Sequence, residues 1–211
     1  MITIFALKSA PAFARGLVRD LRVRWALEEA GLPYEARLIE RGAQATDAYR
    51  ALQPFGQVPV FEEDGLTLFE TGAIVLYIGE RSEVLLPKDA GSRARATMWL
   101  LAALNSIEVC TQRLFELDIF FAGQDWVKEY RPHVEARTKQ RLAELAKALG
   151  DKDYLDGRFT AGDLMMTTVL RLLCNTDLMA AEPKLVAYQA RCEARPAFQR
   201  ALRDQMATFQ G

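Results

Sequence analysis

Residues 57–81 read QVPVFEEDGLTLFETGAIVLYIGER, and this stretch does most to determine the predicted fold. Proline has no N–H to give a sheet, so Pro59 belongs at the start of a strand or on a sheet edge. Asp64-Gly65 lies between two apolar runs and fits a two-residue hairpin turn, which requires positive φ angles. The stretch therefore predicts a strand, a tight hairpin, a second strand and a helix.

The start of this helix carries polar groups that suit a small zwitterion. Thr71 is the expected N-cap of a helix with Ile74 and Ile78 on its apolar face. A helix start offers free N–H groups and a partial positive charge, which favour a bound carboxylate. Glu70 alongside supplies a negative charge for an ammonium group. Each residue alone also fits a plain cap or an acid that answers the helix dipole, so the functional interpretation rests on their combination.

Composition and charge exclude several classes of protein. The chain has 211 residues, 50% of them hydrophobic and 26% charged, with a net charge of −1. This is ordinary globular composition and gives no electrostatic reason to expect a nucleic acid or a membrane as partner. The three cysteines, Cys110, Cys174 and Cys192, are far apart, which fits a reducing compartment. With no leader-like segment before the first strand-like run, we expect a cytoplasmic protein.

Strand-like and helical runs alternate in the first part of the chain. Residues 2–7 and 34–39 are expected strands, and 17–30 and 46–52 are expected helices that precede the hairpin. The resulting β-α-β-α-β-β-α order is typical of a thioredoxin-like domain, a small mixed sheet with helices on both faces.

The second part of the chain shows no strand pattern. We expect an α/β thioredoxin-like domain at 1–81, a linker at 82–92 and an all-helical domain at 93–211. Thr160 and Asp163 predict a helix start with a capping box in which Asp replaces the usual Glu or Gln. Pro183 and Pro196 suit the first turns of two further helices. Three helical stripes are expected to be core: Met98, Leu101, Asn105, Glu108 and Gln112; Leu100, Leu104, Ile107 and Leu114; and Val134, Thr138, Leu142, Leu145 and Leu149.

Taken together, these motifs resemble those of the cytosolic glutathione transferases. Gln57-Val58-Pro59-Val60 resembles the family's cis-proline strand, where the residue before the proline pairs through its backbone with the cysteinyl part of glutathione. Glu70-Thr71 resembles the pair that holds the γ-glutamyl head. The resemblance covers nearly the whole chain, through QPFG at 53–56, RWALEEAGLPYE at 24–35 and FTAGD at 159–163.

This resemblance implies a function, a co-substrate and a partner. The implied activity joins the glutathione thiolate to small apolar electrophiles, as in detoxification, with peroxidase or disulfide-reductase side activity. The co-substrate is glutathione, no metal is expected, and the partners are a small electrophile and a second copy in a homodimer. Arg41 and Gln57 are candidates for holding the glycine carboxylate of glutathione.

The segment after the first strand contains two candidates for the group that would stabilise the thiolate. The family uses a Tyr, Ser or Cys after the first strand, but the segment KSAPAFARG at 8–16 has only Ser9, several residues before the usual position. Ser9 equally fits a polar residue that closes a strand. Arg15, Arg19 and Arg22 follow helical spacing, and Arg15 with free backbone N–H groups could stabilise a thiolate. A solvated basic face is the alternative, and it is our interpretation of Arg19 and Arg22.

Aromatic residues offer a pocket for the electrophile. Phe13 lies in the loop after the first strand, and Phe115 lies in the helical part with further aromatics nearby in the sequence. Both also fit simple packing. His133 is the only histidine, so no histidine-based metal cluster is indicated.

Two other functions remain open from the sequence. The second hypothesis is a non-catalytic binding or regulatory protein on the same scaffold. The absence of a Tyr or Cys in the loop gives it weight, because a fold does not fix a function. A disulfide- or peroxide-reducing enzyme that uses only the thiols of bound glutathione needs no cysteine of its own.

Overall fold

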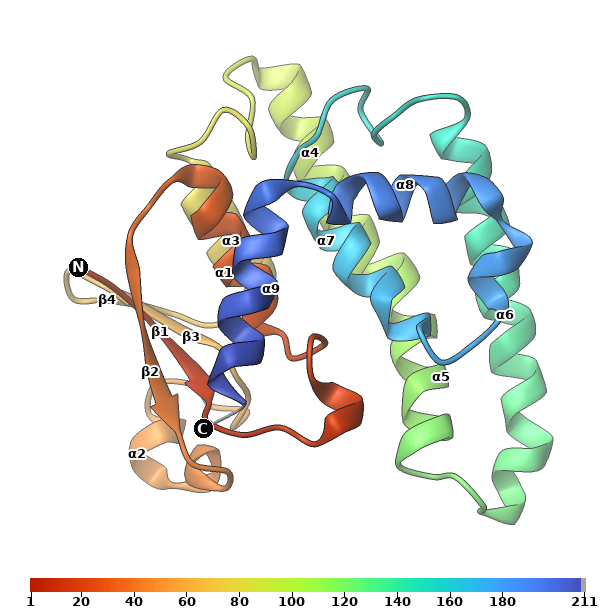
Figure 1. Cartoon of the computed structure of the whole chain (residues 1–211), viewed down its shortest axis with the longest axis horizontal. Coiled ribbons are helices and arrows are strands. Elements are labelled where there is room, and N and C mark those ends of the chain that lie inside the picture. The colour runs from red at the N-terminus through yellow and green to blue at the C-terminus, as the bar shows by residue number, and fades with distance from the viewer. Residues whose placement is uncertain (210–211) are drawn as a thin grey trace. The chain divides into compact units, whose positions relative to one another are not determined.

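The computed structural model describes residues 1–209, which form two compact units. The first unit comprises Met1–Leu86 together with 194–209, and the second is Pro87–Glu193. The first holds a mixed sheet with helices, and the second is helical throughout (Figure 1). The expected class, a thioredoxin-like α/β domain followed by an all-helical one, is confirmed.

The first unit is built on a four-stranded sheet with the order β2-β1-β3-β4. Its strands are β1 (Ile2–Leu7), β2 (Tyr34–Ile39), β3 (Val60–Glu63) and β4 (Leu66–Leu68). β1 runs parallel to β2 and antiparallel to β3, and β3 pairs antiparallel with β4. Asp64 and Gly65 join β3 to β4 with φ angles of 49° and 85°, as the hairpin prediction requires.

Alternate residues of the strands face opposite layers of helix. Phe5 and Val60 pack with Tyr49 of α2 (Asp47–Arg50), a short helix preceded by the turn η2 (Ala43–Ala45). Phe61 is fully buried, and its ring lies 5.6 Å from that of Tyr77 in α3 (Thr71–Gly79). The sheet is therefore covered on both faces, as expected (Figure 1).

The first long helix, α1 (Asp20–Ala30), starts three residues later than the expected 17–30. The segment before it forms a short turn, η1 (Ala12–Ala14), and Gly16 takes a φ angle of 76°, outside the helical region. Gly31 ends α1 with a φ angle of 66°, as predicted.

A buried polar network joins α1 to the last helix, α9 (Pro196–Thr208). Asp20 accepts hydrogen bonds from Arg24 Nε at 2.7 Å and from Gln205 Nε2 at 2.6 Å. The amide of Gln205 also donates to the carbonyl of Val18 at 3.0 Å. Burial raises the pKa of Asp20, and the Arg24 and Gln205 bonds oppose that shift. The network thus binds α9 to α1 within the first unit. The domain bounds at 1–81, 82–92 and 93–211 stay a prediction.

The second unit consists of helices joined by short turns. They are α4 (Ala90–Ala102), the π-helical turn η3 (Ala103–Glu108), α5 (Val109–Ile119), α6 (Asp125–Leu149), α7 (Ala161–Leu170), η4 (Arg171–Leu173), η5 (Leu178–Ala181) and α8 (Pro183–Glu193). α4 and α7 approach closely at Gly162, where a Cβ atom would lie 2.5 Å from Cβ of Trp99. Glycine is required at that crossing because any side chain would collide with α4.

The start of α7 confirms the predicted capping box. Asp163 accepts from the backbone N–H of Thr160 at 2.9 Å, and the Thr160 hydroxyl accepts from the first turn of the helix. Asp163 also accepts from the Leu155 N–H at 2.9 Å and from the Tyr188 hydroxyl at 3.0 Å. This buried carboxylate therefore links three separate segments of the second unit.

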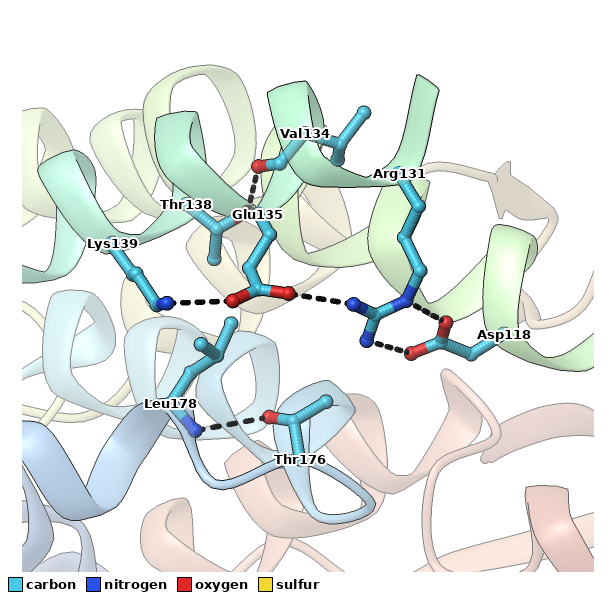
Figure 2. A network of polar contacts seen from close by, with 8 residues as sticks. All are labelled: Asp118, Arg131, Val134, Glu135, Thr138, Lys139, Thr176 and Leu178. Carbon is cyan, nitrogen blue, oxygen red and sulfur yellow. Dashed lines mark hydrogen bonds and ion pairs between the residues drawn. The ribbon is translucent and has the colours of Figure 1, made fainter. Parts of the chain in front are cut away.

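Ion pairs join α5 to α6. Arg131 donates to both oxygens of Asp118, from Nε at 2.6 Å and from Nη2 at 3.0 Å. Figure 2 shows the same guanidinium reaching Glu135, which also pairs with Lys139 at 2.6 Å. These bonds lower the pKa of Glu135, mainly through Lys139 and Arg131. A planar guanidinium suits this geometry because it donates to two acceptors in fixed directions.

Of the three predicted core stripes, the one that starts at Met98 is wrong at its first two residues. The stripe from Val134 to Leu149 on α6 is buried, as expected. On α4, however, Met98 is 51% exposed and Leu101 is 46% exposed. Leu100, Ile107 and Leu114 of the neighbouring stripe are buried, as expected. The continuous helix thus has one buried apolar side and, at Met98 and Leu101, an exposed one.

We expect Gln205→Ala to lower the free energy of unfolding by about 1–3 kcal/mol, because it leaves the buried Asp20 without its amide donor. Urea denaturation followed by circular dichroism measures the change. Gln199→Ala, at an exposed position on the same helix, is the matched control, with an expected effect within about 0.5 kcal/mol. Equal effects of the two substitutions would contradict a stabilising role for the network.

Candidate functional site

The register of the sheet brings the predicted site residues to one end of it. Leu7 of β1 pairs with Ile39 of β2, so the segments after these strands, which hold Ser9 and Arg41, start side by side. The ladder of β3 with β1 ends at Val60 paired with Phe5, and Val58 precedes this end of β3 by two residues. The ladder of β3 with β4 ends at Phe61 paired with Leu68, so Pro59 and Glu70 each lie two residues beyond its last pair.

The Val58-Pro59 peptide bond is cis, as in the expected proline strand. Val60 is the first residue of β3 that pairs with β1, so the backbone of Val58 lies before this ladder. The Val58 side chain packs against the Phe5, Tyr49 and Val60 cluster. A fixed side chain with its backbone outside the ladder suits main-chain recognition of an extended peptide.

Two side chains form hydrogen bonds with the backbone of the segment that precedes this proline. The Oε1 atom of the buried Gln53 accepts from the N–H of Phe55 at 2.7 Å and of Gln57 at 3.2 Å. The Tyr49 hydroxyl donates to the Gln57 carbonyl at 2.8 Å. Burial raises the pKa of Tyr49 to about 12, so this hydroxyl stays a donor at neutral pH. Both backbone groups of Gln57 are thus engaged, and its exposed side chain is what it offers to a ligand.

Glu70 occupies an unusual backbone conformation just before α3. Its φ and ψ angles are 69° and 114°, which is a strained conformation for any residue except glycine. The structure corrects the expected N-cap: Glu70 holds that position, without a side-chain cap bond, and Thr71 is the first helical residue. The Glu70 side chain is exposed, so its carboxylate can meet a cation from solution.

Thr71 and the start of α3 lie next to Glu70 in the chain. We call Val58-Pro59, Glu70 and Thr71 together the corner. Thr71 is 6% exposed, and its Oγ1 accepts a hydrogen bond from Nη1 of Arg22 at 3.3 Å. The first intrahelical bond of α3 runs from the Ile74 N–H to the Glu70 carbonyl at 3.0 Å. By helix geometry, the N–H groups before Ile74 have no intrahelical acceptor, and they favour an anion.

The prediction that Arg22 is a solvated basic residue is wrong. It is 4% exposed and lies on α1 against the start of α3. The fully buried side chains of Val23, Ala26 and Leu27 show that α1 is enclosed on several faces. The apolar residues at 21, 23 and 25–27 indicate in the sequence that this helix is buried. No residue near Arg22 in the sequence indicates that its partner is Thr71.

Ser9, Arg15 and Phe13 lie in the segment between β1 and α1. Ser9 is exposed, and Phe13 is 37% exposed in η1. Arg15 is also exposed, and its Nε donates to the Ala10 carbonyl at 3.2 Å. A shared helix face for Arg15, Arg19 and Arg22 requires an early helix start. Because α1 begins at Asp20, Arg15 and Arg19 lie outside it and this requirement is not met.

The other two predicted site residues are Arg41 of the first unit and Phe115 of the second. Arg41 is exposed in the turn after β2. Phe115 is 9% exposed on α5 and packs edge-on to Phe120, with ring centroids 6.2 Å apart. Among residues 1–209, no three His, Cys, Asp or Glu side chains gather as metal ligands. No helix in the described part of the chain has the length and apolar character to cross a membrane.

Comparisons with known proteins agree on one family. The profile of the glutathione S-transferase N-terminal domain matches residues 13–80. The chain is 30% identical to a glutathione S-transferase of Arabidopsis thaliana, over 82% of this chain and 74% of that one. It is also 30% identical to the GstA glutathione S-transferase of Escherichia coli, over 78% of this chain and 82% of that one.

A solved structure shares the fold over almost the whole length. It is a glutathione transferase from Burkholderia graminis with two glutathione molecules bound per subunit. The TM-score is 0.83 and the identity is 26%, over 95% of this chain and 87% of that one.

The backbone of Glu70 yields a stability prediction. Glu70→Gly removes the side chain and the strain of a positive φ angle, whereas Glu70→Ala removes the side chain and keeps the strain. We expect the glycine variant to exceed the alanine variant by about 1 kcal/mol in free energy of unfolding, after allowing for the larger unfolded-state entropy of glycine. Urea titration measures both. An alanine variant at least as stable as the glycine variant would show that Glu70 is unstrained.

Proposed function

Because the chain belongs to the glutathione S-transferase family and is an enzyme of that family, we propose that it joins the thiolate of glutathione to small apolar electrophiles. The observation that supports this most is the corner formed by the cis Val58-Pro59 bond and the Glu70-Thr71 pair. An extended tripeptide with an amino-acid head fits that corner in both charge and hydrogen bonding.

The positions of Val58, Glu70 and Thr71 support one pose for glutathione. Its cysteinyl backbone pairs with that of Val58, ahead of the ladder. The ammonium group of its γ-glutamyl head meets the exposed Glu70, and the carboxylate of that head meets Thr71 and the free N–H groups of α3. The glycine carboxylate at the other end extends toward Arg41 or the side chain of Gln57.

In this pose, the thiol lies toward the segment after β1. Ser9, as a hydroxyl donor, and Arg15, as a cation, are the proposed stabilisers of the thiolate, because both favour the charged form of a nearby thiol. The thiol proton passes to solvent, sulfur forms a bond to the electrophilic carbon, and the leaving group departs with the bonding electron pair. Phe13, half-exposed in η1, is the proposed apolar contact for the electrophile, and Phe115 stays a second candidate.

A reductase side activity is the second proposal. The related transferase of Burkholderia graminis binds two glutathione molecules per subunit. Two thiols supply the two electrons that convert a hydroperoxide to an alcohol and water, or a disulfide to two thiols, and leave as glutathione disulfide. This chemistry needs no protein thiol, which fits a segment at 8–16 without cysteine.

We also propose a homodimer that acts in the cytoplasm. Three apolar side chains share the surface of the continuous α4–η3–α5 helix: Met98, Leu101 and Val109 are 51%, 46% and 58% exposed. A row of exposed apolar residues is typical of an interaction surface, and a second copy of the chain is its proposed partner. Reduced cytoplasm is compatible with three cysteines that are all free.

The clamp predicts an order of effects on glutathione affinity. Glu70→Ala removes a charged partner of the ammonium group, so the Kd of glutathione should rise about tenfold to a hundredfold. Ser9→Ala and Arg15→Ala should change the Kd less and lower kcat instead. Calorimetry measures the affinities, and a chlorinated nitroarene, a hydroperoxide and a mixed disulfide separate the activities. Unaltered affinity in Glu70→Ala would refute the clamp, and binding without turnover of any substrate would indicate a binding protein.

The dimer surface gives a separate prediction. Leu101→Glu places a charge in the proposed apolar contact, so the protein should sediment as a 23.7 kDa monomer while the unchanged chain sediments as a dimer. Val186→Glu, at a 45% exposed apolar position on α8, is the control and should leave the dimer intact. A monomeric unchanged chain would rule out the surface.

A further inference from the structure

A buried arginine contacts Thr71, a residue of the proposed γ-glutamyl site. Arg22 belongs to α1 and is 4% exposed, and Thr71 opens α3 and is 6% exposed. The Nη1 atom of Arg22 lies 3.3 Å from Oγ1 of Thr71. This contact joins positions 49 residues apart in the sequence, at the point where the proposed ligand carboxylate would sit.

The direction of this hydrogen bond determines what Thr71 can do. A guanidinium group has five N–H donors and no acceptor, so the threonine oxygen must accept. With one lone pair used toward Arg22, the hydroxyl hydrogen points elsewhere and can be donated to a ligand.

Charge acts in the same direction as the hydrogen bond. Arginine keeps its positive charge in proteins, and buried charges are screened less than exposed ones. The start of α3 adds the partial positive charge of its free N–H groups. The exposed carboxylate of Glu70 lies on the neighbouring residue. The corner thus presents a positive side and a negative side, as an α-amino acid does.

We propose that Arg22 is a positioning residue for the α-carboxylate of the γ-glutamyl group: it fixes the Thr71 hydroxyl as a donor and supplies positive potential from behind it. This inference rests on the proposed glutathione site. It assigns the recognition of that carboxylate to an α1–α3 contact as well as to the start of α3. Arg22 does not touch the thiol, so its effect belongs to binding rather than to chemistry.

The test compares two ligands on matched variants. Glutathione carries the α-carboxylate, and 4-aminobutyryl-cysteinylglycine lacks it. Arg22→Met should raise the Kd of glutathione about tenfold, because a charge-assisted contact is lost. The Kd of the analogue should change less than about twofold. Arg22→Lys, which keeps the charge, should recover part of the affinity. In kinetics, the KM for glutathione should rise while kcat at saturation stays unchanged.

Two controls separate positioning from a purely structural role. Arg24→Met removes a second buried arginine of α1, one that pairs with Asp20 rather than with Thr71. It should lower stability without changing the affinity of the folded protein for either ligand. In a Thr71→Val background, Arg22→Met should weaken glutathione binding by only about twofold to threefold, because the oriented hydroxyl is already gone.

Equal loss of affinity for both ligands in Arg22→Met would overturn the inference, as would an unchanged affinity for glutathione. If Arg22→Met fails to fold, Arg22→Lys and Thr71→Val decide the matter: a loss in Thr71→Val confined to glutathione supports the site, and a loss shared by the analogue refutes it. Failure of the unchanged chain to bind glutathione would instead refute the proposed function, which is a distinct result.

Discussion

The antiparallel register of β3 is the constraint on which the candidate site depends. β3 pairs with β1 on one side and with β4 on the other, and it carries Val60 and Phe61 into the core on opposite faces. A shift of one residue would turn both side chains to the wrong face, so packing enforces the register. Val58-Pro59 and Glu70 lie within two residues of the last pairs of these ladders. The geometry of the site is therefore a consequence of how the core packs.

The two charges of the corner are held in different ways. Glu70 is exposed, and it has a strained backbone conformation at the start of α3. Arg22 is buried, and its position is set by a helix that is enclosed on several faces. An exposed acid can exchange solvent for an ammonium group at small cost, whereas a buried cation acts through space on an anion that arrives nearby. In the proposed site, a negative charge next to a positive one would favour a zwitterion over a simple acid or amine.

Local sequence chemistry predicted those features that depend on neighbouring residues. The Asp64-Gly65 hairpin, the Thr160–Asp163 capping box and the first-turn position of Pro196 all have causes within a few residues. The thioredoxin-like order of elements followed from the alternation of short runs. The family's motifs also identified Glu70 and Thr71 as the pair to examine.

Features that depend on distant contacts were not predictable from the sequence. The late start of α1 removed Arg15 from the face assigned to it, because Gly16 interrupts the helical spacing. Arg22 fits a solvated stripe by spacing alone, and only the packing of α1 against α3 shows that it is buried. Met98 has the spacing of a core residue, yet it faces outward because the opposite side of α4 is already packed against α7.

The most direct test of this account is a crystal structure of the protein with bound glutathione. The account predicts that the cysteinyl backbone lies beside Val58, with the γ-glutamyl ammonium against Glu70 and the carboxylate within hydrogen-bond distance of the Thr71 hydroxyl. An empty corner at saturating glutathione, or a tripeptide bound elsewhere with Glu70 and Thr71 free of it, would contradict the account.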